Sequence, residues 1–135
     1  MIKIGGLIIS NEKGEILLMK RDNKDTIPFP DTWDIFGGHV EEGETPAEGM
    51  KREIREELEW NVTSYSFFRK YSCYTGDVHI NTKYIYAAVL DRPLDTLTLH
   101  EGQTMKFFAA AEIPDLPFAN IVKHIVMDYL TKDET

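Results

Sequence analysis

The sequence is poor in cysteine and has no long apolar run. Cys73 is its one cysteine, so no internal disulfide can form, which favours a reducing compartment. The first ten residues, MIKIGGLIIS, are too short and too polar at their flanks for a secretory signal. No apolar run reaches the length that a membrane-spanning helix needs. We therefore expect a cytoplasmic protein that does not bind a membrane.

Basic residues are also scarce. The chain has 23 acidic and 15 basic residues and a formal net charge of −8, so long nucleic acid would be repelled. An acidic protein can still bind a small nucleotide if metal ions carry the contact. Linkers, internal repeats and low-complexity runs are absent, and 42% of the 135 residues are hydrophobic. We expect one domain over residues 1–135, as a monomer or a homodimer.

The sequence does contain a dense group of carboxylates between Gly37 and Asn61, in the stretch GGHVEEGETPAEGMKREIREELEWN. Glu53, Glu56 and Glu57 are three and four residues apart, so on a helix they form one acidic patch. Like charges this close repel and raise each other's pKa, which favours a bound hard divalent cation. Magnesium is the expected ion, with manganese as the alternative.

The residues before these carboxylates indicate where the helix begins. Thr45 can cap it, Pro46 suits its first position, and Glu48 stands at the capping-box spacing from Thr45. Stepping 100° per residue places an apolar arc beside the carboxylates, made of Ala47, Met50, Ile54 and Leu58. One side of the helix should therefore pack while the adjacent side binds.

This stretch resembles the signature of the Nudix hydrolase family, and of its MutT-like members, G-x5-E-x7-R-E-U-x-E-E-x-G-U, where U is bulky and aliphatic. Seven of the nine fixed positions agree. The departures are Glu59, in place of glycine, and Trp60, in place of an aliphatic residue. We expect Asn61 to take over the left-handed helix end that the glycine provides. The alternative, an ordinary solvated helix, requires the glycines, the capped start and the carboxylates to coincide by chance.

The resemblance implies a fold and a chemistry. The fold is an α/β/α sandwich with a mixed sheet. The chemistry is magnesium-dependent hydrolysis of the diphosphate linkage in a nucleoside di- or triphosphate, or in a related NDP-X compound. The positions that bind metal in relatives, and that are implied to act in catalysis, correspond here to Glu53, Glu56, Glu57 and the carbonyl of Gly37.

Three further motif positions are implied to be structural. They are Gly38, Glu44 and Arg52. Arg52 lies inside the helix and is expected to brace neighbouring carboxylates such as Glu48 or Glu56. Glu44 is expected to support the loop or an outer contact of the metal.

The rest of the chain reads as strands and one more helix. We expect strands at 2–10 and 15–21, paired as a hairpin, a strand running into Gly37, two antiparallel strands within 62–90, and a short strand at 105–109. The turn between the two long strands is expected at residues 75–77. Apolar residues at helical spacing from Ile121 to Leu130 predict the last helix.

Three residues outside the acidic helix are candidates for the site. Glu101, in an EGQ string, is similar to a loop glutamate of MutT-like enzymes and is a candidate ligand or general base, as is a helix glutamate. Asn120 resembles the asparagine that reads guanine in those enzymes, which would make 8-oxo-dGTP a candidate substrate, but it also suits a helix N-cap. Arg21 is expected to face substrate phosphates, or to end a solvated strand.

The aromatic residues and the remaining nucleophiles are less informative. Trp33, Tyr84 and Tyr86 are candidates for base stacking, although strand aromatics mostly form core. Cys73 and His79 have no triad partner at an informative spacing, so nucleophilic catalysis has no support.

Two rival functions remain. The segment at residues 37–40 resembles Nudix-like isopentenyl diphosphate isomerases, in which a histidine at the position of His39 binds metal. Their chemistry also uses a cysteine where this chain has Gly37, which disfavours an isomerase. A nucleotide sensor of the Nudix fold commonly loses part of the glutamate set, which is intact here.

Overall fold

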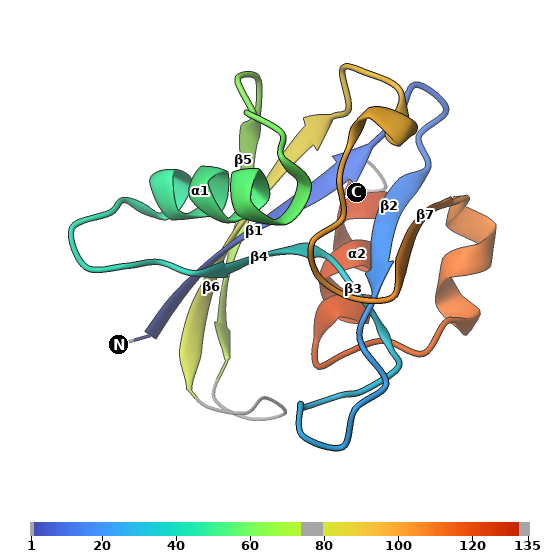
Figure 1. Ribbon diagram of the computed structural model, residues 1–135, viewed down its shortest axis with the longest axis horizontal. Coiled ribbons are helices and arrows are strands. Elements are labelled where there is room, and N and C mark those ends of the chain that lie inside the picture. The colour runs from blue at the N-terminus through green and yellow to red at the C-terminus, as the bar shows by residue number, and fades with distance from the viewer. Residues whose placement is uncertain (1, 74–79, 133–135) are drawn as a thin grey trace.

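Strand β1 (Ile2–Ser10) is the middle strand of a mixed seven-stranded sheet in the computed structural model, which describes residues 2–73 and 80–132 (Figure 1). Along one edge β1 pairs in parallel with β6 (Asn81–Val89) over its whole length. Along the other edge it pairs antiparallel first with β4 (Phe36–His39) and then with β2 (Ile16–Lys20). Because β4 and β2 occupy successive parts of the same edge of β1, the sheet divides into two branches between these two strands.

The other strands extend this sheet. β5 (Ser66–Cys73) pairs antiparallel with β6, and β3 (Trp33–Asp34) and β7 (Thr104–Phe108) both pair antiparallel with β2. The predicted strands and the hairpin of β1 with β2 are therefore confirmed, with ends that differ by a few residues. The turn predicted at 75–77 lies outside the described residues.

Helices α1 (Pro46–Leu58) and α2 (Val122–Leu130) cover opposite faces of the sheet (Figure 1). Alternate side chains of β1 enter two separate cores, because strand side chains point alternately to the two faces. Leu7 and Ile9 pack with α1, and Ile8 packs with α2. The predicted α/β/α sandwich is confirmed. With 13 and 9 residues these helices are short, and no helix in the described part of the chain is long and apolar enough to cross a membrane.

Helix α1 begins as predicted and ends differently. Thr45 and Glu48 form a complete capping box, with Thr45 Oγ1 accepting from the Glu48 N–H at 3.1 Å. The predicted apolar arc is buried at Met50, Ile54 and Leu58 and partly buried at Ala47. At the C-terminus Glu59 itself adopts the left-handed conformation, with φ 55°, so the prediction that Asn61 would do so is wrong.

The reason for the early helix end is the residue that follows it. Trp60 is 2% exposed and belongs to the core between α1 and the sheet. The chain must therefore leave the helix at once to bring the indole ring inward, and the turn falls on Glu59. Two short 3-10 turns, η1 (Leu94–Thr96) and η2 (Ala110–Asp115), lie in the connections around β7.

Candidate active site

Glu57 is the buried member of the predicted carboxylate set. It is 5% exposed, and its Oε1 accepts a hydrogen bond of 3.3 Å from the backbone N–H of Gly37. A Cβ atom at Gly37 would collide with the carbonyl oxygen of Gly5, and the φ of 145° is one that glycine adopts readily. Glycine at this position therefore lets strand β4 lie against β1 and present its N–H to the helix carboxyl.

Burial is also the main cause of an altered charge state at Glu57. Burial, followed by the nearby charges of Glu101 and Glu53, raises the pKa of the Glu57 carboxyl to about 9. The hydrogen bond from Gly37 acts in the opposite direction but is the smaller effect. In the absence of a cation this carboxyl is therefore protonated at neutral pH.

Arg52 connects the other carboxylates. Its guanidinium forms two hydrogen bonds to Glu44, of 2.8 and 3.1 Å, and contacts Glu53 at 3.0 Å and Glu56 at 3.3 Å. It also donates to the His39 carbonyl at 2.9 Å. Arg52 thus contacts Glu56, one of the two carboxylates that it was expected to brace.

Glu44 and Glu48 each accept a backbone hydrogen bond in the segment that leads into helix α1. Glu44 accepts from the backbone N–H of Glu41 at 2.8 Å, and the Arg52 guanidinium lowers the pKa of Glu44. The carboxylate of Glu44 therefore links the loop before α1 to Arg52. The Glu48 side chain accepts from the backbone N–H of Thr45 in the capping box. Among the described residues it does not form the contact with Arg52 that was predicted as one of two possibilities.

Gly38 provides the space that Glu53 occupies. A Cβ atom at Gly38 would collide with the Glu53 carboxyl group, whose oxygens would lie 2.7 Å from it. Any larger residue must therefore displace that carboxylate. Among the described residues no three His, Cys, Asp or Glu side chains are gathered closely enough to hold a metal ion, because Glu53 and Glu56 turn to Arg52 while Glu57 turns to Gly37.

The loop at residues 97–103 brings Glu101 to this helix. Backbone N–H groups of Thr98 and His100 donate to the carbonyls of Leu58 and Glu57, at 3.2 and 2.9 Å. At its other end the loop is held to β2, where the Gln103 N–H donates to the Lys20 carbonyl at 2.8 Å. Glu101 is exposed between these two anchors and close enough for its charge to act on Glu57.

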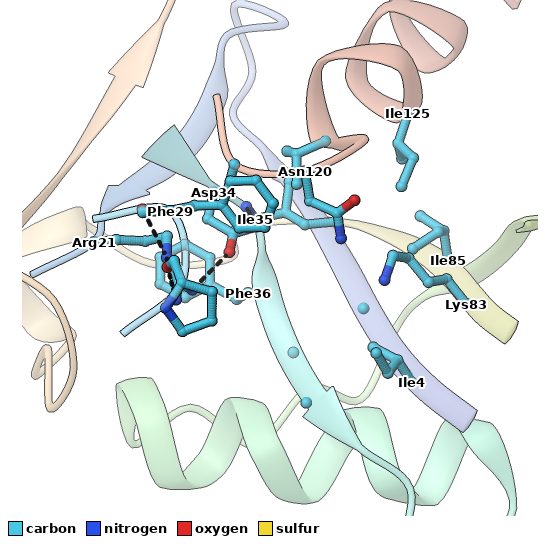
Figure 2. Close-up of a pocket in the computed structure, with 16 residues that line it drawn as sticks. Ile4, Arg21, Phe29, Asp34, Ile35, Phe36, Lys83, Ile85, Asn120 and Ile125 are labelled. Atoms are coloured by element: carbon cyan, nitrogen blue, oxygen red, sulfur yellow. Dashed lines mark hydrogen bonds and ion pairs between the residues drawn. The ribbon is translucent and has the colours of Figure 1, made fainter. Parts of the chain in front are cut away.

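Two cavities adjoin these residues. The acidic pocket has a volume of about 160 Å³ and is lined by Met19, Arg21, Asp22, Ile27, Asp34, Ile35, Gly37, Glu57, Glu101 and Gly102. The apolar pocket has a volume of about 210 Å³, and its lining includes Ile4, Ile35, Phe36, Ile85, Val122 and Ile125 (Figure 2). Arg21, Asp34, Ile35 and Gly37 line both pockets. The acidic pocket and the apolar pocket are therefore neighbours with a common wall.

Arg21 and Asp34 form the polar part of that wall. The Arg21 guanidinium contacts Asp34 Oδ2 at 3.3 Å and donates to the carbonyls of Pro28 and Phe29 at 2.8 and 3.2 Å (Figure 2). Burial raises the pKa of Asp34 to about 6, although the Arg21 charge opposes this. Arg21 thus holds the 22–32 loop in place and lines both pockets, and its contact with substrate phosphates stays a prediction.

Asn120 points its amide into the apolar pocket (Figure 2). Its backbone is left-handed, with φ 51°, and the N-cap of α2 is Ile121, which makes no side-chain cap. The interpretation of Asn120 as a helix cap is therefore wrong. Its Oδ1 atom is buried and accepts no hydrogen bond from the described part of the chain. The contact of Asn120 with a base stays a prediction.

Other pocket residues were not predicted from the sequence. Asp34 and Lys83 line the apolar pocket, as does the exposed ring of Phe29. The aromatic candidates for stacking, Trp33, Tyr84 and Tyr86, line neither of the two pockets and pack in the cores. The signal that could have identified Asp34 is its place three residues before Gly37, at the start of the motif.

Known proteins resemble this chain in sequence and in structure. It is 39% identical over 62 residues to an 8-oxo-dGTP diphosphatase of Haemophilus influenzae, which is 43% of this chain and 41% of that protein. The MutT protein of Methanosarcina mazei superposes with a TM-score of 0.81 at 18% identity, covering 99% of this chain and 96% of that one. The NUDIX domain of Shewanella oneidensis NrtR, solved with ADP ribose, superposes with a TM-score of 0.80 at 14% identity, covering 98% and 88%.

The two kinds of likeness differ in extent. The sequence match spans about two fifths of the length of the Haemophilus relative, whereas the structural likeness covers nearly the whole chain and shows the fold. The model of the NUDIX domain matches residues 3–129. Since this range covers nearly the whole chain, the chain belongs to the NUDIX domain family.

Proposed function

We propose that this protein hydrolyses the diphosphate linkage of a nucleoside triphosphate or of an NDP-X compound, with a purine nucleotide such as 8-oxo-dGTP among its substrates. The observation that carries this proposal is the common wall of the two pockets. A nucleotide has an anionic diphosphate joined to a flat, largely apolar base. The acidic pocket suits a diphosphate accompanied by cations, and the apolar pocket beside it suits the base.

The carboxylates fit a divalent cation in their chemistry. Glu53, Glu56 and Glu57, with the carbonyl of Gly37, offer the hard oxygen ligands that magnesium and manganese prefer. The raised pKa of Glu57 supports this, because a carboxyl held beside other acids gains from a nearby positive charge. A cation bound there would neutralise phosphate oxygens and lower the pKa of a water molecule. Binding it requires Glu53 and Glu56 to exchange Arg52 for the cation.

The reaction needs one group that accepts a proton. Hydrolysis joins a water oxygen to phosphorus, breaks the bond from that phosphorus to the bridging oxygen, and releases a proton from the water. We assign Glu101 as this base, because it is exposed at the acidic pocket while Glu57 is buried. A helix glutamate is the alternative. Arg21, at the common wall, would place positive charge near the phosphates.

The base would lie in the apolar pocket. There the side-chain amide of Asn120 offers a donor and an acceptor together, which suits a purine edge such as that of guanine. The names of relatives support nucleotides as substrates. The Haemophilus relative is an 8-oxo-dGTP diphosphatase, and the Shewanella domain was solved with ADP ribose, an NDP-X compound.

The test is product identification with a panel of purine and pyrimidine triphosphates, 8-oxo-dGTP, ADP ribose and sugar nucleotides, with magnesium, with manganese and with excess chelator. We expect cation-dependent release of a nucleoside monophosphate from at least one compound. Glu56→Gln and Glu57→Gln should abolish turnover while the circular dichroism spectrum is retained. Full turnover in excess chelator, or in either variant at saturating magnesium, would contradict the proposed metal site.

The control is a carboxylate of the same helix that lies outside the site. Glu48 is engaged in the capping box, so Glu48→Gln should retain turnover and lose at most about 1 kcal/mol of stability. Binding of a nucleotide without any product, by protein whose glutamates are intact, would instead favour a nucleotide sensor.

A further inference from the structure

Lys83 is a buried lysine in the wall of the apolar pocket. It lies on β6 opposite Ile4 of β1 and is 7% exposed. Its Nζ donates to Asn81 Oδ1 at 3.0 Å. Figure 2 shows its ammonium on the same side of the pocket as the amide of Asn120, away from Arg21. The far end of the pocket from the acidic residues therefore holds a cation and an amide together.

A cation in these surroundings is unusual. Near it the pocket is lined by Ile4, Ile85 and Ile125, and lysine is rarely buried unless specific contacts, such as the one to Asn81, hold it. The carboxylate of Asp34 is the anion that lines the same pocket, and the Lys83 charge acts on it. The Arg21 guanidinium, the other cationic group of this lining, is turned to the 22–32 loop and to Asp34.

These groups define what a bound base must offer. The ammonium of Lys83 has three N–H donors and no acceptor, so a base atom that meets it must be an acceptor. The buried Oδ1 of Asn120 can only accept, so it requires a donor. A carbonyl next to a ring N–H, as in guanine and hypoxanthine, supplies both at adjacent positions. Adenine can donate from its amine to Asn120 Oδ1, but it offers the Lys83 ammonium only a ring nitrogen. That nitrogen has one lone pair, whereas a carbonyl oxygen has two.

We propose that Lys83 determines specificity by donating to the carbonyl oxygen of a purine base whose ring N–H is bound by Asn120. This rests on the proposed function for the orientation of the substrate, with phosphates in the acidic pocket and the base in the apolar pocket. The protein then prefers oxopurine nucleotides over otherwise identical nucleotides that lack this carbonyl.

The test compares two ligands that differ only at that edge. Guanine and 2-aminopurine share the amino group at C2, but 2-aminopurine has neither the C6 carbonyl nor the ring N–H. Dissociation constants of dGMP and of 2-aminopurine deoxyribonucleoside monophosphate are measured by calorimetry for the wild type and for Lys83→Met. Methionine keeps the length and suits an apolar wall. We expect the preference of the wild type for dGMP to fall about 10- to 100-fold, because a hydrogen bond from a charged donor is lost.

The matched control is Lys70→Met. Lys70 is exposed on β5 and lines neither of the two pockets, so its removal should leave the preference unchanged. Thermal unfolding is followed for all variants. The preference is the ratio of the two dissociation constants of one protein, so a smaller folded fraction affects both constants equally and cancels. Lys83→Arg, which retains a donor, should keep part of the preference.

The outcomes separate this inference from the proposed function. If Lys83→Met weakens both ligands equally, or changes neither, or if the wild type shows no preference, Lys83 does not read the base. If the wild type prefers dGMP and Lys83→Met removes that preference while no compound of the panel is hydrolysed, the proposed hydrolase is wrong and the role of Lys83 stands. The kcat/KM values of the two triphosphates should show the same ratio in a protein that hydrolyses them.

Discussion

Glu57→Gln should stabilise the metal-free protein near neutral pH, although it removes a residue of the proposed site. The folded state holds a proton on this carboxyl up to a pKa of about 9, whereas the unfolded chain releases it near 4.5. A group whose pKa is raised in the folded state stabilises that state fully below the unfolded pKa. This stabilisation is lost as the pH rises toward the folded pKa. The free energy of unfolding of the wild type should therefore fall between about pH 5 and pH 9.

The size of the effect follows from linkage. Each pH unit between the two pKa values costs about 1.4 kcal/mol, which gives an upper bound of about 3.5 kcal/mol at pH 7. Relaxation around the charge reduces this, and we expect about 1–3 kcal/mol. Glutamine has nearly the same shape, carries no charge, and can still accept the Gly37 hydrogen bond through its amide oxygen. The free energy of unfolding of Glu57→Gln should therefore fall less with rising pH than that of the wild type.

The assay is urea unfolding in excess chelator at several values from about pH 5 to pH 8, followed by tryptophan fluorescence. Glu57→Gln should match the wild type at the lowest pH and exceed it at the highest. Saturating magnesium should stabilise the wild type and have less effect on the variant. Glu56→Gln is the control, since this neighbouring carboxylate has a side chain that is 56% exposed. A Glu57→Gln protein with the same pH slope as the wild type would refute the reasoning.

Three further substitutions test the supports of the site. Gly38→Ala should displace the Glu53 carboxylate and weaken magnesium binding in a calorimetric titration, with little effect on the circular dichroism spectrum. Arg52→Lys loses the double hydrogen bond to Glu44 and should lower the free energy of unfolding in urea by about 1–3 kcal/mol. Tyr71→Phe removes a 2.7 Å hydrogen bond between β5 and α2 and should cost about 0.5–1.5 kcal/mol in the same assay, with kcat/KM unchanged.

Helix α1 could be predicted from the sequence because its signals are local, whereas the sandwich was implied by the family resemblance of the acidic stretch. The capping box at Thr45 and the apolar arc of α1 each involve residues within a few positions of one another. Such patterns fix an element and its buried face without any knowledge of its neighbours. The early end of α1 was missed because it depends on Trp60 entering a core made largely by distant strands.

The apolar pocket could not be predicted, because it forms through pairings between distant residues. Lys83 reaches it only because β6 pairs in parallel with β1 in a register that sets residue 83 opposite Ile4. A shift of one residue would turn Lys83 to the other face of the sheet. Asn120 was read partly as a cap because α2 was expected to start one residue earlier. Nothing near Asn120 in sequence shows that its side chain faces a pocket.

The departure at Glu59 illustrates how a local penalty can be offset by a distant contact. A residue other than glycine in the left-handed conformation costs about 1 kcal/mol. The Glu59 carboxylate contacts His100 Nε2 at 2.5 Å, and an exposed pair of this kind returns about 0–1 kcal/mol. The contact therefore offsets at most the cost of the left-handed residue, and the helix end has its left-handed geometry without glycine. Because His100 precedes Glu101, the same contact adds a third tie between helix α1 and the loop that carries the proposed base.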